Sequence, residues 1–340
     1  MKVSIIIPVY KAANYIELCI KSIMDQTYQD IECFLVNDAS PDDSVSIAEQ
    51  FIANYNGPIQ FYILNHEQNR GPAVARNTGI YAATGDYICF MDSDDEITPD
   101  CIEKLAKPIL EDPTIEMVEG CYSIITTIEN DTPSEHPVSK PHLEFTTKET
   151  VKNFYLSRCS ENIYPWNKLV CKNFLEKNKL YFRDIRIAED SFWHFHCFQH
   201  LSHLYTIPDI TYKYYTRPNS ITTTLHQDTR NKYAPFYAEI AKSLSPDDCV
   251  REVKYFLKGF CLFYVGGPIT PIYKQTAKHF LKVLKEKHCI KDWFFLESIV
   301  VLSKFTPTRK IIKNIGDFYK CKKMKNKRLL LQIISYKRNP

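Results

Sequence analysis

Residues 85–95, GDYICFMDSDD, are the part of the sequence from which both the fold and the chemistry can be inferred. Tyr87 to Met91 make an apolar run with β-branched and aromatic side chains, which predicts a buried strand. The run ends abruptly in three carboxylates, Asp92, Asp94 and Asp95. Acids this close together raise one another's pKa and cost stability, unless a cation lies among them or they face open water.

A hard divalent ion is the simplest such cation. Mg²⁺ or Mn²⁺ prefers oxygen ligands and commonly takes one or two protein carboxylates, which leaves positions for water and substrate phosphates. The end of this strand therefore predicts a metal and diphosphate site. The competing interpretation is an acidic turn, because Asp and Ser both favour turns.

Three strands and three helices are expected before this stretch. We expect the strands at 3–7, 31–36 and 59–64, and the helices at about 14–26, 40–55 and 73–83. Asn14 and Ser40 are the expected caps of the first two helices. This alternation predicts an α/β fold with a parallel sheet, in which ligands collect beyond the carboxyl ends of the strands. Four polar landmarks lie just past those ends: Tyr10, Asp38, Arg70 and Asp92.

At this point the sequence resembles glycosyltransferase family 2. The resemblance rests on SIIIPVYKAANYIELCIKSIMDQTYQDIECFLVNDASPDDS, GPAVARNTGIYAATGDYICFMDSDD, PWNKLV and the pair Glu189-Asp190, and it covers about residues 1–225. It implies a GT-A fold with a mostly parallel central sheet, followed by a C-terminal helical region. It also implies inversion at the anomeric carbon of a nucleotide-activated sugar, with Mn²⁺ or Mg²⁺ as cofactor.

The resemblance also implies roles for individual residues. Asp94, with Asp92, would hold the metal, and Arg217 and Ser220 would contact the diphosphate. The residues expected at the nucleotide are Pro8, Val9, Tyr10, Asp38, Asn69, Arg70, Asp92 and Ser93. Asp38 would accept a hydrogen bond from uracil, since an ionised carboxylate is an acceptor only.

Asp190 is the catalytic base that the resemblance implies. Inversion requires a base on the face of the sugar opposite the leaving diphosphate, where it takes the proton of the acceptor hydroxyl. Glu189 would be its neighbour in the sugar or acceptor pocket. The alternative is a pair of acids in the first turn of a helix, a position that the helix dipole favours.

Three further positions leave alternatives open. Trp166 would offer its face to the donor or acceptor sugar, or pack within the fold. Lys168 would line the same pocket, or form an ion pair inside the fold. Arg76 would contact a ligand, or brace the acidic strand end as a counter-ion.

The pattern loosens after residue 99. We expect a helix at 100–110, a strand at 116–122 that 124–128 extends, a surface loop at 130–141, a helix from about 146 and a strand at 210–216. The helix after Asp190 carries His196 and His200 four residues apart, a spacing that suits a metal. Large apolar residues between them favour a packing helix instead.

Domain boundaries follow from these patterns. Residues 1–225 form the expected catalytic domain, with a nucleotide-binding half at 1–100 and an acceptor-binding half at 101–225. A helical cap at 226–317 and a basic amphipathic tail at 318–340 follow. The tail holds eight basic residues and no acid, so the first 317 residues carry a net charge of −5.

Composition bears on the cellular setting. Twelve cysteines without C-x-x-C spacing, several of them in apolar strands, indicate free thiols in a reducing compartment. Neither a signal peptide nor an apolar run long enough to span a bilayer is visible. We therefore expect a cytoplasmic protein, whose tail can bind an anionic membrane surface or dock on the cap as a solvated segment.

Together with the predicted metal site, the resemblance implies a metal-dependent hexosyl- or N-acetylhexosaminyltransferase. Its partners would be a UDP-sugar donor and a glycan or lipid-linked acceptor in surface polysaccharide biosynthesis, and not nucleic acid. A nucleotidyltransferase is disfavoured, because no glycine-rich and basic phosphate loop is present. The other alternative is a catalytically idle nucleotide-sugar-binding or scaffold protein.

Overall fold

The computed structural model describes residues 1–126, 134–157, 164–185, 189–217 and 271–286. The chain divides into two compact units, Met1–Thr224 and Leu225–Pro340. The described part of the second unit is one helix, α10 (Pro271–Glu286). The other segments expected in the helical cap, and the basic tail, lie outside the described residues. None of the described helices is long and apolar enough to cross a membrane.

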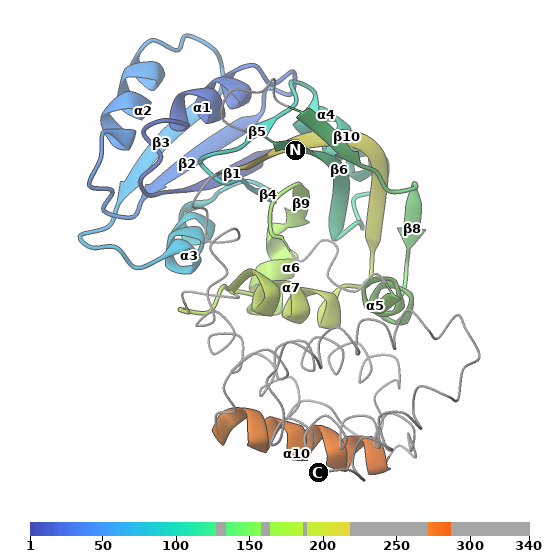
Figure 1. Ribbon diagram of the computed structural model, residues 1–340. Helices are drawn as coiled ribbons and strands as arrows, with labels where there is room; N and C mark the ends of the chain where they lie inside the picture. The colour runs from blue at the N-terminus through green and yellow to red at the C-terminus, as the bar shows by residue number, and fades with distance from the viewer. Residues whose placement is uncertain (127–133, 158–163, 186–188, 218–270, 287–340) are drawn as a thin grey trace. The chain divides into compact units, whose positions relative to one another are not determined.

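Strands and helices alternate through the first ninety residues, as the sequence predicts (Figure 1). The elements are β1 (Val3–Val9), α1 (Ile16–Met24), β2 (Ile31–Asn37), α2 (Ser44–Ala53), β3 (Gln60–Asn65), α3 (Pro72–Ala82) and β4 (Tyr87–Phe90). Strands β1 to β4 pair in parallel in the order β3-β2-β1-β4. Their carboxyl ends therefore share one edge of the sheet.

Strand β1 runs two residues further than expected, because it continues through Pro8 to Val9. A proline removes one ladder donor from a strand. Here the pairing of β1 with β4 ends at Ile6, whereas the pairing with β2 extends to Val9. Pro8 thus lies where β2 alone flanks the strand, and the missing N–H costs little.

The predicted helix caps are wrong. The residue before α1 is Tyr15 and the residue before α2 is Asp43, and neither caps its helix with a side chain. The polar residues before α2 bind the loop after β1 instead. Ser40 Oγ accepts from the N–H of Lys11 at 2.8 Å, and Asp42 Oδ2 accepts from the N–H of Ala13 at 3.0 Å. They fasten the loop that follows Tyr10.

The second half of the unit extends the sheet. Its elements are β5 (Glu96–Ile97), α4 (Cys101–Glu111), β6 (Met117–Thr126), β7 (Ser134–Val138), β8 (Leu143–Phe145), α5 (Lys148–Ser157), β9 (Lys168–Cys171), α6 (Lys172–Lys177), α7 (Glu189–His200) and β10 (Leu204–Thr216). The full path is β3-β2-β1-β4-β9-β6-β10-β5. Strand β9 lies antiparallel between β4 and β6, and β6 pairs in parallel with β10. The sheet is thus mixed, and its larger part is parallel.

Two expectations in this half need correction. The segment 134–138, expected in a surface loop, is strand β7, which pairs antiparallel with β6 at an exposed edge. Strand β10 begins six residues before the expected start at Ile210, and irregular pairing with β6 accommodates Pro208. Both strands contain proline and polar residues, which an edge strand or a bulge tolerates. These residues interrupt the apolar periodicity by which a strand is predicted from sequence.

Helices cover both faces of the parallel strands: α1 and α2 lie on one face, and α3 lies on the other (Figure 1). Ile5 and Ile7 join the core cluster that contains α1. Ile6 points to the opposite face, where a Cβ added to Gly79 of α3 would lie 2.3 Å from its Cγ2. Gly79 therefore allows α3 to approach β1 closely, which places Arg76 of α3 at the carboxyl edge of the sheet.

Candidate active site

Arg76 joins the two acidic motifs of the sequence. Its Nη2 donates to Asp92 Oδ1 at 2.9 Å, and its Nη1 donates to Glu189 Oε1 at 3.3 Å. The residue is 5% exposed, and its Nε has no hydrogen-bond partner among the described residues. Burial alone would lower the pKa of the guanidinium, but the charges of Asp92 and Glu189 raise it. Arg76 is thus a counter-ion to the acidic strand end, which was one of the two alternatives that the sequence left open.

Glu189 and Asp190 begin α7 and face this guanidinium. Burial and the charge of Asp190 raise the pKa of Glu189 to about 7, against the opposing charge of Arg76. Burial also raises the pKa of Asp190, whose Oδ1 accepts from the N–H of Ser191 at 2.6 Å. A carboxylate with a raised pKa accepts protons more readily near neutral pH, which suits a general base.

Residues 92–95, which follow β4, form a loop with three acids that we call the acidic loop, and in it Asp94 lies against Arg217. Arg217 Nη2 donates to the backbone oxygen of Asp94 at 2.5 Å, and Nε lies 3.9 Å from Asp94 Oδ2. The guanidinium also lies over the rings of Tyr15, at 3.8 Å, and Tyr215, at 4.7 Å. Burial and the charge of Asp92 raise the pKa of Asp94 to about 6, although Arg217 opposes this.

Asp95, the third acid, has an internal role. It is 2% exposed, and it accepts from the hydroxyl of Tyr212 at 2.7 Å and from the N–H of Tyr215 at 2.9 Å. The Tyr212 hydroxyl also accepts from the N–H of Asp92 at 3.2 Å. Tyr212 therefore fixes the acidic loop to β10. No local pattern in the sequence distinguished Tyr212 from the other tyrosines of that strand.

Asp38 organises the opposite part of this edge. It is 2% exposed, and it accepts from the N–H of Arg70 at 2.9 Å, the N–H of Gly71 at 2.7 Å and Nδ1 of His66 at 2.8 Å. His66 Nε2 contacts Thr78 Oγ1 at 2.9 Å. Asp38 and His66 thus hold the loop that leads into α3, and His66 is a residue that the sequence reasoning missed.

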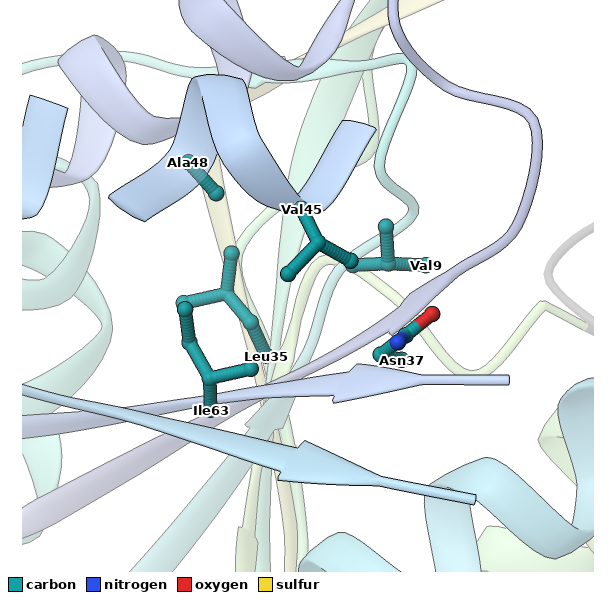
Figure 2. Close-up of a pocket in the computed structure, with 6 residues that line it drawn as sticks. All are labelled: Val9, Leu35, Asn37, Val45, Ala48 and Ile63. Carbon is teal, nitrogen blue, oxygen red and sulfur yellow. The ribbon is translucent and has the colours of Figure 1, made fainter. Parts of the chain in front are cut away.

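The remaining nucleotide candidates differ in accessibility. Tyr10 is 43% exposed at the end of β1. The Val9 side chain is buried beneath α2, in a narrow gap that Leu35, Val45 and Ala48 also line (Figure 2). The Val9 side chain is therefore not accessible to a nucleotide base, and only the backbone of Val9 could contact one.

Arg70 is exposed and lies 3.9 Å from Asp184 Oδ2. Pro8, Asn69 and Ser93 are half-buried near the same strand ends. Ser220, the diphosphate candidate expected beside Arg217, lies outside the described residues. Tyr10, Arg70 and the acidic loop therefore all lie along the carboxyl edge of the parallel strands.

Lys168 lies inside the fold, which is the second of its two alternatives. It is 2% exposed, and its Nζ lies 3.5 Å from Glu119 Oε1. Glu119 is fully buried and also binds Lys140 Nζ, at 3.3 Å, and the hydroxyl of Tyr155. Burial lowers the pKa of the Lys168 ammonium to about 8 despite the charge of Glu119.

Trp166 is packed in a similar way. It is 3% exposed, and its ring stacks on those of Tyr164 and Tyr212. Its face is therefore covered by neighbouring rings. Trp166 therefore packs within the fold, which is the second of its two alternatives.

The acidic loop offers a donor set that suits a metal at the carboxyl edge of the sheet. Asp92 and Asp94 are hard oxygen donors, and burial together with the charge of Asp92 raises the pKa of the Asp94 carboxyl. Another group, Asp112, Glu144 and His203, has ligand atoms within 4.8 Å of one another. His203 immediately precedes β10, at the edge opposite the acidic loop, and its ring nitrogens contact Thr114 and Glu144 at 3.0 Å.

Comparisons with known proteins agree on the family. The family model described as glycosyl transferase family 2 matches residues 4–181. EpsJ of Bacillus subtilis is 33% identical over 221 residues, which are 65% of this chain and 62% of EpsJ. YibD of Escherichia coli is 42% identical over 111 residues, which are 33% of this chain and 31% of YibD. Both are described as uncharacterized glycosyltransferases, and the matches span less than two thirds of either relative.

Solved structures share the fold. The S. aureus TarS fragment 1-349 in complex with UDP-GlcNAc matches with a TM-score of 0.58 at 17% identity, over 88% of this chain and 91% of that chain. The mannosyltransferase PcManGT from Pyrobaculum calidifontis, in complex with GDP-Man and Mn²⁺, matches with a TM-score of 0.53 at 19% identity, over 92% and 83% of the two chains. At these identities the likeness establishes the fold. Because the family model covers more than half of the sequence, the chain belongs to glycosyltransferase family 2.

Proposed function

We propose that this enzyme is an inverting glycosyltransferase that moves a hexosyl or N-acetylhexosaminyl group from a UDP-sugar to a glycan or lipid-linked acceptor in surface polysaccharide biosynthesis. The observation that carries the proposal is the ion pairing of Arg76 with both Asp92 and Glu189. It brings the acid pair of α7 beside the acidic loop, although the two motifs lie about a hundred residues apart in sequence. Direct displacement requires the base and the diphosphate site to lie close together, as these two motifs do.

Asp190 is the proposed base in this displacement. Its carboxylate takes the proton of the acceptor hydroxyl while the acceptor oxygen forms a bond to the anomeric carbon. The bond between that carbon and the diphosphate oxygen breaks, and the electron pair leaves with UDP. Attack from the face opposite the leaving group inverts the anomeric centre. Arg76 donates to Glu189, the residue before Asp190, and its charge partly compensates that of the acid pair.

Asp94 and Asp92 would hold Mn²⁺ or Mg²⁺, which supplies Lewis-acid stabilisation of the leaving diphosphate. The metal-bound PcManGT structure supports this assignment by analogy of fold. Arg217 would contact the diphosphate with Ser220, because a guanidinium fork bridges phosphate oxygens. Arg217 already lies at Asp94, where it partly compensates the acidic loop.

The nucleotide would lie along the strand ends. Tyr10 would cover the base with its exposed ring, with Pro8 and the backbone of Val9 beside it. Asp38 would receive the uracil N–H, since its Oδ2 accepts one hydrogen bond among the described residues and a carboxylate oxygen can accept two. Asn69, Arg70, Asp92 and Ser93 would border the ribose and diphosphate.

The experiment that tests the function measures nucleoside diphosphate release from a panel of UDP- and GDP-sugars, with Mn²⁺ or with chelator. We expect slow, metal-dependent hydrolysis of one UDP-sugar. Asp190→Asn should abolish this turnover and keep UDP binding, because the base does not contact the nucleotide. Binding without turnover by the unaltered enzyme would favour an idle domain, and absence of UDP and GDP binding would refute the nucleotide site.

We also propose a cytoplasmic location with peripheral binding to the inner face of the membrane. The support is the basic and apolar composition of residues 318–340. Truncation after Asp317 should weaken co-sedimentation with anionic vesicles and leave donor hydrolysis unchanged. Equal sedimentation of the truncated and full chains would refute the role of the tail.

A further inference from the structure

Three parallel aromatic rings lie beside the acidic loop. Trp166 stacks on Tyr212 with ring centroids 4.5 Å apart and an angle of 10°, and on Tyr164 at 4.7 Å and 8°. Trp166 forms a parallel bridge with Phe90, the last residue of β4. The stack is therefore attached to the strand that carries the acidic loop.

Tyr212 ties one end of the stack to the acids. Its hydroxyl donates to Asp95 and accepts from the N–H of Asp92. Tyr212 is fully buried, and Trp166 is almost fully buried. These two rings are fixed by packing and by hydrogen bonds, and neither has a free face for a ligand.

Tyr164 is the accessible member of the stack. It is half-buried, and its hydroxyl has no hydrogen-bond partner among the described residues. Tyr214 lies beside it, 6.5 Å away and nearly parallel at 19°. Trp166 therefore supports Tyr164 from one side, and Tyr214 limits its sideways movement.

Tyr164 and the acid pair of α7 belong to the same end of β4, because Trp166, which stacks on Tyr164, bridges Phe90, and Arg76 joins Asp92 to Glu189. Burial, the neighbouring tyrosines and Asp190 together raise the pKa of Tyr164 to about 12. The phenol therefore stays neutral and can donate or accept a hydrogen bond. A rigid aromatic ring with a polar tip suits recognition of a ligand that has an apolar face and hydroxyl groups, and a pyranose has both.

We propose that Tyr164 is the carbohydrate platform of the acceptor subsite, where its ring stacks on the apolar face of an acceptor pyranose whose hydroxyl group faces Asp190. The inference rests on the proposed function and names the acceptor class: a sugar ring, and not the phosphate of a lipid carrier. It assigns to Tyr164 the contact that sequence reasoning gave to Trp166. Trp166 is then a positioning residue that acts through Tyr164.

Saturation-transfer NMR tests the platform without requiring turnover. The probes are methyl β-glucopyranoside, methyl β-galactopyranoside and methyl N-acetyl-β-glucosaminide, each added to the full chain with UDP and Mn²⁺. We expect at least one glycoside to receive saturation, strongest at the ring protons of its apolar face. Tyr164→Ala should weaken its binding at least fivefold, whereas Tyr164→Trp should retain it because the new ring keeps the stacking face.

Two controls separate the possible failures. Tyr81→Ala removes a tyrosine that is 70% exposed and whose ring lies 5.1 Å from that of Tyr181 at a tilt of 30°, and it should change nothing. Calorimetric titration with UDP should give equal affinities for all variants, which shows that the nucleotide site is folded. Equal saturation of the probe with Tyr164→Ala, or no saturation of any glycoside when UDP binds, would overturn the platform alone. Failure of UDP to bind the unaltered chain would instead overturn the proposed function.

Discussion

At the scale of single residues, Arg76 is the most consequential side chain of the site. It holds Asp92 and Glu189 and is almost completely buried. Removing one partner of a buried ion pair typically costs about 3–5 kcal/mol. We therefore expect Arg76→Ala to lower the free energy of unfolding by about this amount, and to abolish donor hydrolysis. Urea unfolding and UDP release would measure the two effects.

The double variant Arg76→Ala, Glu189→Gln is the matched control for this prediction. It removes the guanidinium together with one of the two acids that the guanidinium compensates. Its free energy of unfolding should exceed that of Arg76→Ala. A double variant no more stable than the single variant would show that the ion pair with Glu189 contributes nothing.

His194 predicts a dependence of stability on pH. Its ring is buried against Glu119, Lys140, Lys168 and Tyr155, and its Nε2 has no partner among the described residues. Burial and the charge of Lys168 lower the pKa of His194 to about 3. The unfolded chain binds this proton near pH 6.5, so folding stability falls as the pH falls from about 6.5 towards 3.

The measurement is urea unfolding of the unaltered chain and of His194→Gln at several pH values. Between about pH 6 and pH 4 the unaltered chain should lose about 1.4 kcal/mol per pH unit more than the variant, since one proton is involved. Other buried acids titrate in the same range, but they are common to both proteins. Parallel pH profiles would contradict the prediction.

At the scale of elements, the contact of α3 with β1 sets the position of Arg76. A Cβ on Gly79 would lie 2.3 Å from Ile6 Cγ2, so Gly79→Ala must displace the helix or the strand. We expect a loss of about 1–3 kcal/mol in the free energy of unfolding, together with weaker donor hydrolysis. In an exposed helix the same change stabilises by about 1 kcal/mol, so the sign of the measured change decides whether the close contact exists.

At the scale of the whole catalytic unit, the sheet brings acids from distant segments to one edge. A divalent cation with UDP should therefore stabilise the folded state, by about 2.7 kcal/mol at a hundred times its Kd. We expect Mn²⁺ with UDP to raise the Tm, and Asp94→Asn to remove the increase. Asp112→Asn, in the acidic group at the opposite edge, is the matched control and should keep it. Loss of the increase in Asp112→Asn alone would place the metal at that edge.

The local elements of the first ninety residues, and the edge at which they converge, could be predicted from the amino-acid sequence alone. Apolar runs with period two or 3.6 specify strands and helices locally, and a parallel arrangement brings the strand ends together. The acidic loop, Tyr10 and Arg70 were therefore placed correctly along one edge. The same local periodicity could not reveal β7 or the early part of β10, where Pro137 and Pro208 interrupt the pattern.

The identity of the buried charged and aromatic groups, and their contacts, could not be predicted from the sequence and follow from the complete fold. Lys168 is paired with Glu119 in the interior, Arg76 binds a carboxylate more than a hundred residues away, and Tyr164 covers Trp166. The physical reason is that periodicity reflects the environment of neighbours along the chain. A buried charge or ring is instead placed by packing and desolvation against segments that are remote in sequence, and these depend on the complete fold.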